Sequence, residues 1–119
     1  MKKAVLFIMT MLVLSVILSS CTLFSNSMDK KSGFTKNLDG VETNIRNENW
    51  GEALSGQEKA FKSWRQLKPL LQIDIDHDYV NLIEDYFVRL KAYIETQDKS
   101  EALATVMLIK NAWENIGIM

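Results

Sequence analysis

Hydrophobic residues recur every three or four positions through residues 28–119, the spacing that places side chains on one face of an α-helix. The stripe of the first such segment is Phe34, Leu38, Val41 and Ile45. This pattern predicts a helix that turns the stripe toward a core and ends near Asn47. Strict alternation of apolar and polar residues is rare in the same region, so strands are not predicted.

A second helix is predicted to begin at Trp50. The sequence Asn-x-x-Glu over residues 49–52 has the pattern of a capping box. The apolar stripe of this helix is Trp50, Leu54, Phe61, Trp64, Leu67 and Leu71. Pro69 has no amide hydrogen and its ring clashes with the preceding turn, so we expect the helix to stop or kink near Lys68.

Two further helices follow by the same criterion. The third should begin within residues 74–78, because carboxylates suit the positive N-terminal end of a helix dipole. The fourth follows a second capping box over residues 98–101, and Gly117 is suited to cap its C-terminal end. The stripe of the third helix is Tyr79, Ile83, Tyr86, Leu90 and Ile94, widened by Leu82, Phe87 and Tyr93. The stripe of the fourth helix is Leu103, Val106, Ile109, Trp113 and Ile116.

The two halves of this region align without gaps at an offset of 49 residues. Residues 52–54 match residues 101–103, and Trp64 matches Trp113. Two interpretations remain open: a tandem repeat of a helical hairpin, or two unrelated amphipathic hairpins of equal length. Either one predicts an all-α fold, an antiparallel bundle of about four helices (two helical hairpins) that follows an N-terminal signal helix.

The N-terminal segment has the organisation of a secretory signal. Lys2 and Lys3 precede an uncharged apolar run over residues 4–18, as a basic n-region precedes an h-region. The next residues complete Leu18-Ser19-Ser20-Cys21, which resembles the bacterial lipobox. That resemblance implies a diacylglyceryl thioether on Cys21 and cleavage before it. The alternative is an uncleaved anchor over residues 4–20, at the short limit for spanning a bilayer.

Three segments are therefore predicted: a lipoprotein signal peptide over residues 1–20, a tether over residues 21–27, and a helical bundle domain over residues 28–119. Both interpretations of the N-terminus place the domain at the outer face of the cell membrane. Cleavage leaves 12 Lys and Arg against 15 Asp and Glu, a net charge of −3. We therefore expect membrane lipid to be held through Cys21 rather than through an excess of basic residues.

Composition excludes several classes of function. The whole chain carries 14 Lys and Arg against 15 Asp and Glu, which argues against a nucleic-acid partner. One Cys and one His exclude an internal disulfide and the usual zinc spacings. The sequence also lacks the common hydrolase, metalloprotease, P-loop and dinucleotide motifs, so we predict no enzyme, no catalytic residue and no cofactor.

A set of residues along the domain resembles a bacterial domain-of-unknown-function family, number 4363. The resemblance covers roughly residues 30–116 and its marks are Asn47, Trp50, Ala53, Trp64, residues 75–77, residues 89–93 and Ala102. Members of that family are small proteins with an apolar N-terminus, mostly from Gram-positive anaerobes and spore formers. Their usual Asn-Ile-Phe-like ending is only partly kept in residues 115–119. The resemblance implies an exported, membrane-tethered helical domain and assigns no activity.

The densest polar cluster is Asp74, Asp76, His77 and Asp78. Carboxylate oxygens are ligands for divalent cations, but an EF-hand that began at Asp74 would need Gly and Glu where Tyr79 and Asp85 stand. Capping of the third helix is the competing interpretation of the same residues. The cluster is the weak candidate for a metal site, and no metal ligand is assigned.

The candidate partner-binding residues are Trp50, His77, Arg89 and Tyr93. Trp50 stands beside a turn, where an aromatic side chain can anchor a partner or fix the turn to the bundle. Trp64 and Trp113 lie on apolar stripes and are predicted core residues. We expect a membrane-anchored, non-catalytic interaction or structural module whose partner is an integral membrane protein. The alternative is a lipoprotein that binds a small ligand or a divalent metal.

Overall fold

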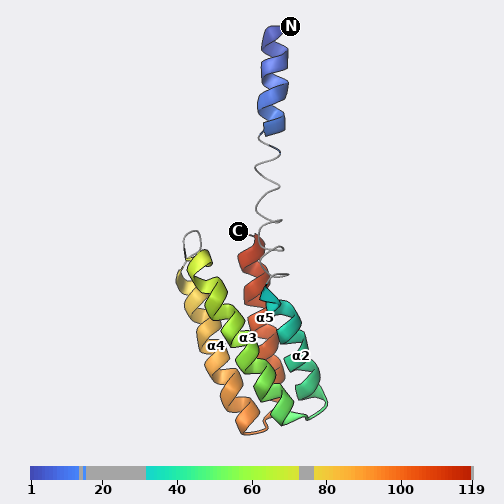
Figure 1. Cartoon of the computed structure of the whole chain (residues 1–119), viewed down its shortest axis with the longest axis vertical. Helices are drawn as coiled ribbons and strands as arrows, with labels where there is room; N and C mark the ends of the chain where they lie inside the picture. The colour runs from blue at the N-terminus through green and yellow to red at the C-terminus, as the bar shows by residue number, and fades with distance from the viewer. Residues whose placement is uncertain (14, 16–31, 73–76, 119) are drawn as a thin grey trace.

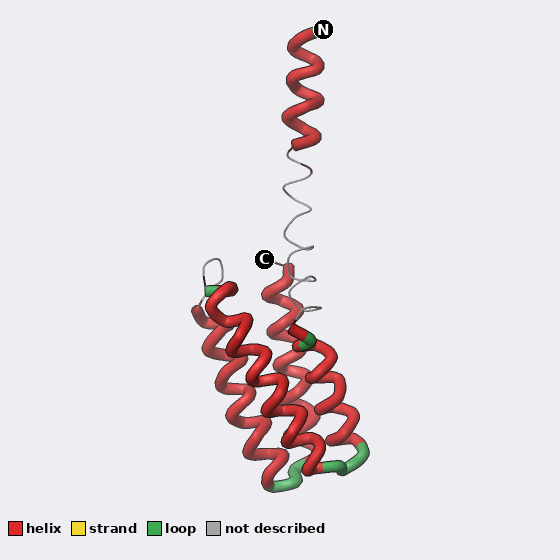
Figure 2. The backbone as a smooth tube through the Cα atoms, in the orientation of Figure 1, coloured by secondary structure: helices red, strands yellow, loops and turns green. Residues whose placement is uncertain are grey.

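The computed structural model describes residues 1–13, 15, 32–72 and 77–118. Four helices of this part pack together: α2 (Phe34–Arg46), α3 (Trp50–Leu71), α4 (His77–Glu95) and α5 (Lys99–Ile118). They run up and down as an antiparallel bundle (Figure 1). Residues 2–13 form a further helix, and the described residues contain no strand (Figure 2). The predicted all-α bundle is confirmed.

The core is a continuous apolar cluster to which all four helices contribute. Its largest fully buried side chains are Trp64, Phe34, Phe87, Leu38, Ile45, Ile83, Leu90, Ile94 and Ile109. The ring of Phe34 lies 5.9 Å from that of Trp64 and 4.9 Å from that of Trp113, measured between centroids. The four stripe residues predicted for α2 are all fully buried, and both predicted core tryptophans are confirmed.

The same turn connects the helices of each hairpin. Glu48 and Gln97, 49 positions apart, both have a positive φ, 59° and 57°. The Glu48 amide donates to the Ile45 carbonyl and the Asn49 amide to the Asn44 carbonyl, at 3.0 and 2.8 Å. These two bonds are the paired hydrogen bonds of a Schellman motif. The equivalent bonds of the second turn join Gln97 to Ile94 and Asp98 to Tyr93.

Burial follows the same offset as the turns. Each buried residue of α2 has a buried counterpart 49 positions later in α4; the pairs are Phe34 with Ile83, Leu38 with Phe87, Val41 with Leu90, and Ile45 with Ile94. Across the bundle, α2 packs on α5 and α3 packs on α4. Matched hairpins that pair in this reciprocal way are related by an approximate two-fold axis. The geometry therefore supports the tandem repeat.

Two predicted helix ends differ from the structure. Helix α3 continues past Pro69 to Leu71, because burial of Leu67 and Leu71, 4% and 5% exposed, offsets the hydrogen bond that proline removes. Helix α5 continues through Gly117 to Ile118, so this glycine does not cap the helix. The predicted end of α2 at Asn47 is confirmed.

The two capping boxes behave differently. Asp98 accepts a hydrogen bond from the Glu101 amide at 3.2 Å, as predicted. Asn49 is the N-cap residue of α3, but its side chain makes no capping hydrogen bond. The backbone amides of Asn49 and Asp98 both donate within their Schellman turns, so neither amide needs the side chain at the third helical position as an acceptor.

The predicted stripe of α4 is displaced toward Val80 and Phe87. Both are buried, whereas Tyr79, Tyr86 and Tyr93 are only partly buried at the edge of the core. Leu82, predicted to widen the stripe, is 38% exposed. The aromatic residues of α4 therefore border the core and leave part of each ring at the surface.

The positive φ of Glu48 predicts how a glycine at this position changes stability. Glu48→Gly should raise the free energy of unfolding by about 1 kcal/mol, because glycine adopts a positive φ without the Cβ penalty. Asn47, with φ −88°, is the matched control, and Asn47→Gly should give no gain. Urea unfolding followed by circular dichroism measures both. A loss of stability in Glu48→Gly would contradict the assigned turn.

Candidate functional site

The predicted lipidation site lies outside the described residues. Cys21 and the tether over residues 21–27 fall there, as does part of the predicted signal. Of the helices in the described part of the chain, none combines the length and apolar content needed to cross a bilayer. Lipidation of Cys21 therefore stays a prediction from sequence.

The acidic cluster around His77 is described only in part. Asp74 and Asp76 lie outside the described residues, and His77 and Asp78 are exposed in the first turn of α4. Among the residues that the structure places, no group of three or more His, Cys, Asp or Glu could hold a metal ion. The full cluster stays the weak candidate for a metal site, with no metal ligand assigned.

The four candidate partner-binding residues do not share one surface. His77 begins α4 at the end of the bundle where α2 also begins. Trp50 begins α3 at the opposite end (Figure 1) and packs partly buried against the core. Arg89 and Tyr93 lie one turn apart on α4, the first exposed and the second partly buried. A partner that contacts all four residues would have to follow the length of the bundle.

A charged cluster joins α2 to α5. The Lys110 ammonium lies 2.6 Å from an Asp39 carboxylate oxygen and 2.5 Å from one of Glu42. Arg46, one turn along α2, donates to the other Glu42 oxygen at 2.8 Å. Glu42 and Lys110 are the less exposed members, with side chains 21% and 24% exposed. Their position between two helices gives the cluster a structural role.

The cluster shifts two pKa values. Hydrogen bonds from Lys110 and then Arg46 lower the pKa of Glu42 below its ordinary 4.5. Partial burial acts to lower the pKa of Lys110, but hydrogen bonds to Asp39 and Glu42 outweigh it and leave the pKa above 10.5. Both shifts favour the charged forms that the ion pair requires.

These shifts predict how stability depends on pH. The contribution of Glu42 is present above its unfolded pKa and is lost as pH falls through its lower folded pKa. The contribution of Lys110 is present below its unfolded pKa and is lost as pH rises through its higher folded pKa. Urea unfolding from about pH 3 to about pH 11 should show both losses, and Lys110→Met should reduce both. Unchanged pH dependence in this variant would contradict the assignment.

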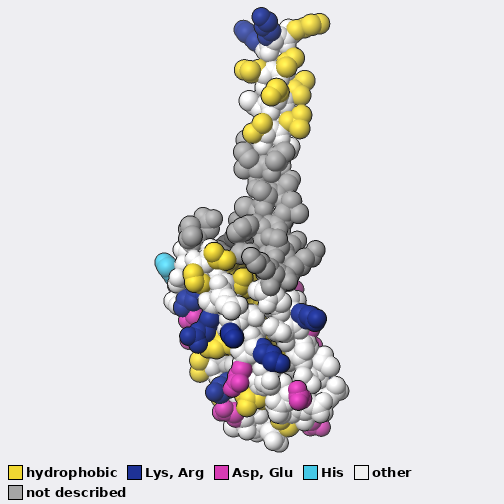
Figure 3. Space-filling view, viewed as in Figure 1, with side chains coloured by type: hydrophobic (Ala, Val, Ile, Leu, Met, Phe, Trp, Pro, Cys, Tyr) yellow, Lys and Arg dark blue, Asp and Glu magenta, His cyan; other side chains and the backbone are white. Residues whose placement is uncertain are grey.

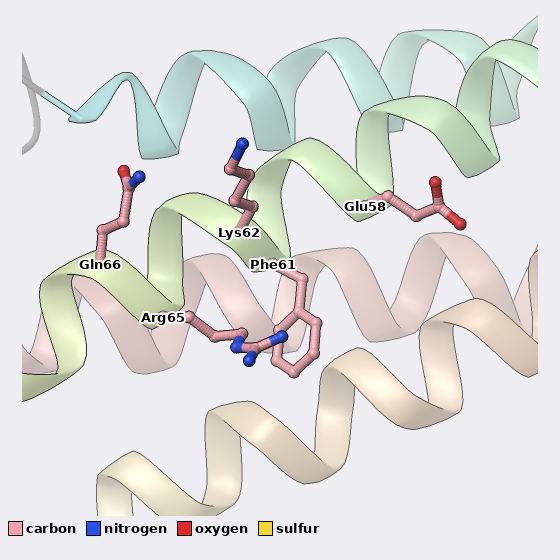
Figure 4. A pocket seen from close by; sticks show the side chains of 5 residues that line it. All are labelled: Glu58, Phe61, Lys62, Arg65 and Gln66. Atoms are coloured by element: carbon pink, nitrogen blue, oxygen red, sulfur yellow. The ribbon is translucent and has the colours of Figure 1, made fainter.

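A shallow hollow lies on α3 and is lined by Glu58, Phe61, Lys62, Arg65 and Gln66. Figure 4 shows that all five side chains come from this one helix, so no second element closes the hollow. The Arg65 guanidinium lies 5.9 Å from the centre of the Phe61 ring, within cation–π range. This arrangement places two cations and one carboxylate beside a half-buried aromatic ring.

Large apolar side chains are exposed on α4 and α5. Val88 is 67% exposed, Met107 57% and Leu108 45%. Reasoning from sequence missed these positions because it followed the buried stripes. Residues 106–109 are four consecutive apolar residues. A helix cannot turn four consecutive side chains toward the same core, so some of them must be exposed. That excess of apolar residues was the available signal.

Comparison with known proteins identifies one relationship. A family model described as "Domain of unknown function (DUF4363)" matches residues 23–118, which confirms the resemblance found over residues 30–116. No curated protein and no solved structure matches the chain.

Proposed function

Because this chain belongs to the DUF4363 family, whose description names no activity, we propose a function from its own residues. The chain is a lipoprotein anchored through Cys21 at the outer face of the cell membrane. Its bundle is a non-catalytic module that docks on an integral membrane protein. The lipobox-like sequence over residues 18–21 supports the anchor.

The observation that carries the docking role is the exposure of Met107 and Leu108 on α5. The bundle has a complete apolar core without them, so folding does not require apolar residues at these positions. Their counterparts in the repeat, 49 positions earlier, are Glu58 and Lys59, both charged and exposed. Adjacent apolar side chains that the fold leaves exposed are available for contact with a partner.

The placement of the titratable groups favours a non-catalytic role. Among the residues that the structure describes, the pKa of Glu42 is lowered and that of Lys110 is raised, and both shifts are accounted for by the ion pairs that join α2 to α5. A perturbed acid or base in a cleft would instead indicate catalysis. Here the shifted groups stabilise contact between helices.

Affinity capture tests the docking role. Tagged full-length protein is recovered from gently crosslinked native membranes, and the bound proteins are identified by mass spectrometry. We expect one dominant membrane protein, lost when Met107→Ser and Leu108→Ser are combined. The matched control combines Asn81→Ser and Asp85→Ser, two exposed polar positions on α4, and should retain it. Recovery of this chain alone would contradict the proposal.

A further inference from the structure

The second half of α3 carries cations without acidic partners. From residue 59 to residue 72 the sequence contains four basic residues and no Asp or Glu. Lys68 pairs with Glu84 of α4 at 2.7 Å. Lys59, Lys62 and Arg65 are exposed and form no ion pair with the residues that the structure places. We call these three residues the basic face.

Several cations elsewhere in the bundle form ion pairs. Arg46 and Lys110 bind Glu42, and Lys91 lies 3.9 Å from Glu95. These pairs join positions on one helix or across two helices. Among the described residues of the bundle, three further cations are also exposed and form no ion pair: Lys36, Arg89 and Lys99. Each of them lies on a different helix, whereas the basic face groups three such cations on α3, in a domain whose overall charge is negative.

The repeat shows that the fold does not require the basic face. The counterparts of Lys59, Lys62 and Arg65, 49 positions later in α5, are Leu108, Asn111 and Glu114. Helix α5 packs into the bundle as α3 does, with a neutral or acidic residue at each of these positions. The positive charge on α3 is consequently free to serve binding.

The basic face also lies toward the end of the bundle where α2 begins. Helix α2 is the bundle helix that follows Cys21 in the sequence. Helix α3 ends where α2 begins (Figure 1), and Phe34, the first residue of α2, follows Cys21 by 13 positions. Figure 3 shows several Lys and Arg side chains on the face where α3 runs in front, with Asp and Glu side chains among them. Leu70, in the last turn of α3, is 54% exposed and adds an apolar group beyond the cations.

We propose that the basic face rests on the anionic phospholipid headgroups of the membrane to which the chain is tethered. This inference rests on the proposed anchor at Cys21. The headgroup phosphates bind Lys59, Lys62 and Arg65, and Leu70 inserts at the level of the headgroups. The exposed apolar residues of α5, which belongs to the other hairpin, are then left for the protein partner.

The size of the effect suits a tethered protein. Each cation at an anionic surface raises affinity roughly fivefold, so three give roughly a hundredfold. That is weak for recruiting a soluble acidic protein from solution. It is sufficient to orient a domain that an anchor already holds at high local concentration. A lipid surface is favoured over an acidic peptide because the hollow beside Arg65 is shallow and is lined by a single helix.

Lysine footprinting on vesicles tests this orientation. Full-length protein, extracted from cells in detergent, is reconstituted into phosphatidylcholine vesicles with or without about one-third phosphatidylglycerol. Brief acetylation, carried out on these vesicles and on native membranes, is then quantified by peptide mass spectrometry. On the anionic vesicles Lys59 and Lys62 should react roughly fivefold more slowly, and about 0.5 M salt should remove the difference. Lys99, exposed at the opposite end of the bundle, is the internal control and should react equally on both.

Matched variants separate a charge effect from simple crowding. Lys59→Gln combined with Arg65→Gln should reduce the protection of Lys62. Arg89→Gln combined with Lys91→Gln, two exposed cations of α4, should leave that protection unchanged.

Three outcomes would overturn the inference in distinguishable ways. Equal labelling on both kinds of vesicle, by protein that floats with them, refutes the basic face and leaves the anchor intact. Protein that separates from the vesicles during flotation refutes the anchor and this inference with it. Protection in native membranes but not on anionic vesicles assigns the basic face to an acidic protein instead.

Discussion

Trp64→Ala should lower the free energy of unfolding by about 3–5 kcal/mol, the range for removing a large buried aromatic side chain. Trp64 is fully buried and its ring contacts Phe34 from α2 and Trp113 from α5, with centroids 5.9 and 6.3 Å away. Alanine would leave a cavity where three helices meet. A loss of this size is a large part of the stability of a small domain.

Two controls make the prediction specific. Trp64→Phe should cost much less than Trp64→Ala, because the indole nitrogen of Trp64 is buried without a hydrogen-bond partner and its loss breaks no bond. Trp50→Ala removes a partly buried ring at the start of α3 and should also cost less. Urea unfolding measures all three variants. A cost below about 1 kcal/mol for Trp64→Ala would contradict the central position assigned to this residue.

Gln57→Glu should destabilise the bundle by about 3 kcal/mol near neutral pH. Gln57 is 3% exposed, and its side-chain amide donates to the Phe87 carbonyl at 3.1 Å. The substitution replaces a donor with a carboxylate, which would be buried against an acceptor. Because burial raises the pKa of the introduced carboxyl, the loss should shrink as pH falls and the group becomes protonated.

The control for Gln57 comes from the repeat. Val106 occupies the equivalent position of the second hairpin and is fully buried, so the site accepts an apolar residue. Gln57→Met should therefore change stability by less than about 1.5 kcal/mol. Thermal and urea unfolding at two pH values measure both variants. An equal loss in Gln57→Met and Gln57→Glu would show that packing, and not charge, decides this position.

Helix identity was predictable because the period of apolar residues directly reflects burial. The stripe of α2 from Phe34 to Ile45 became the buried face without exception, and the 49-residue offset recurred in the turns at Glu48 and Gln97. The Schellman geometry itself was not predictable. Glutamate and glutamine carry little preference for a positive φ, so tertiary packing of the two hairpins imposes it there.

The end of α3 shows where local rules fail. Because Pro69 has no amide hydrogen, the helix was predicted to end near Lys68. The helix instead continues to Leu71, because Leu67 and Leu71 pack in the core. For α4, the apolar pattern placed Leu82 beside the stripe, whereas the neighbouring helices cover Val80 and Phe87. Periodicity defines a stripe, and its exact centre depends on which helices lie on either side.

The candidate surfaces required three-dimensional information. The negative net charge argued against binding to anionic lipid. A net charge does not distinguish Lys110, whose charge is neutralised in an ion pair, from Lys62, which has no ion pair among the described residues. The sequence does not show which of the candidate partner-binding residues share a surface, and the fold places Trp50 and His77 at opposite ends of the bundle. Comparison of α3 with α5 became informative only after the repeat was established in the structure.

The lipid anchor at Cys21 is the claim on which both proposals depend. Intact mass spectrometry of full-length protein, extracted by detergent from bacterial membranes, tests it most directly. A lipid tether predicts a chain that begins at Cys21 and carries the added mass of a diacylglyceryl group, while Cys21→Ser yields an unmodified chain from Met1. An unmodified wild-type chain that begins at Met1 and stays in the membrane fraction would contradict the tether and favour an uncleaved anchor.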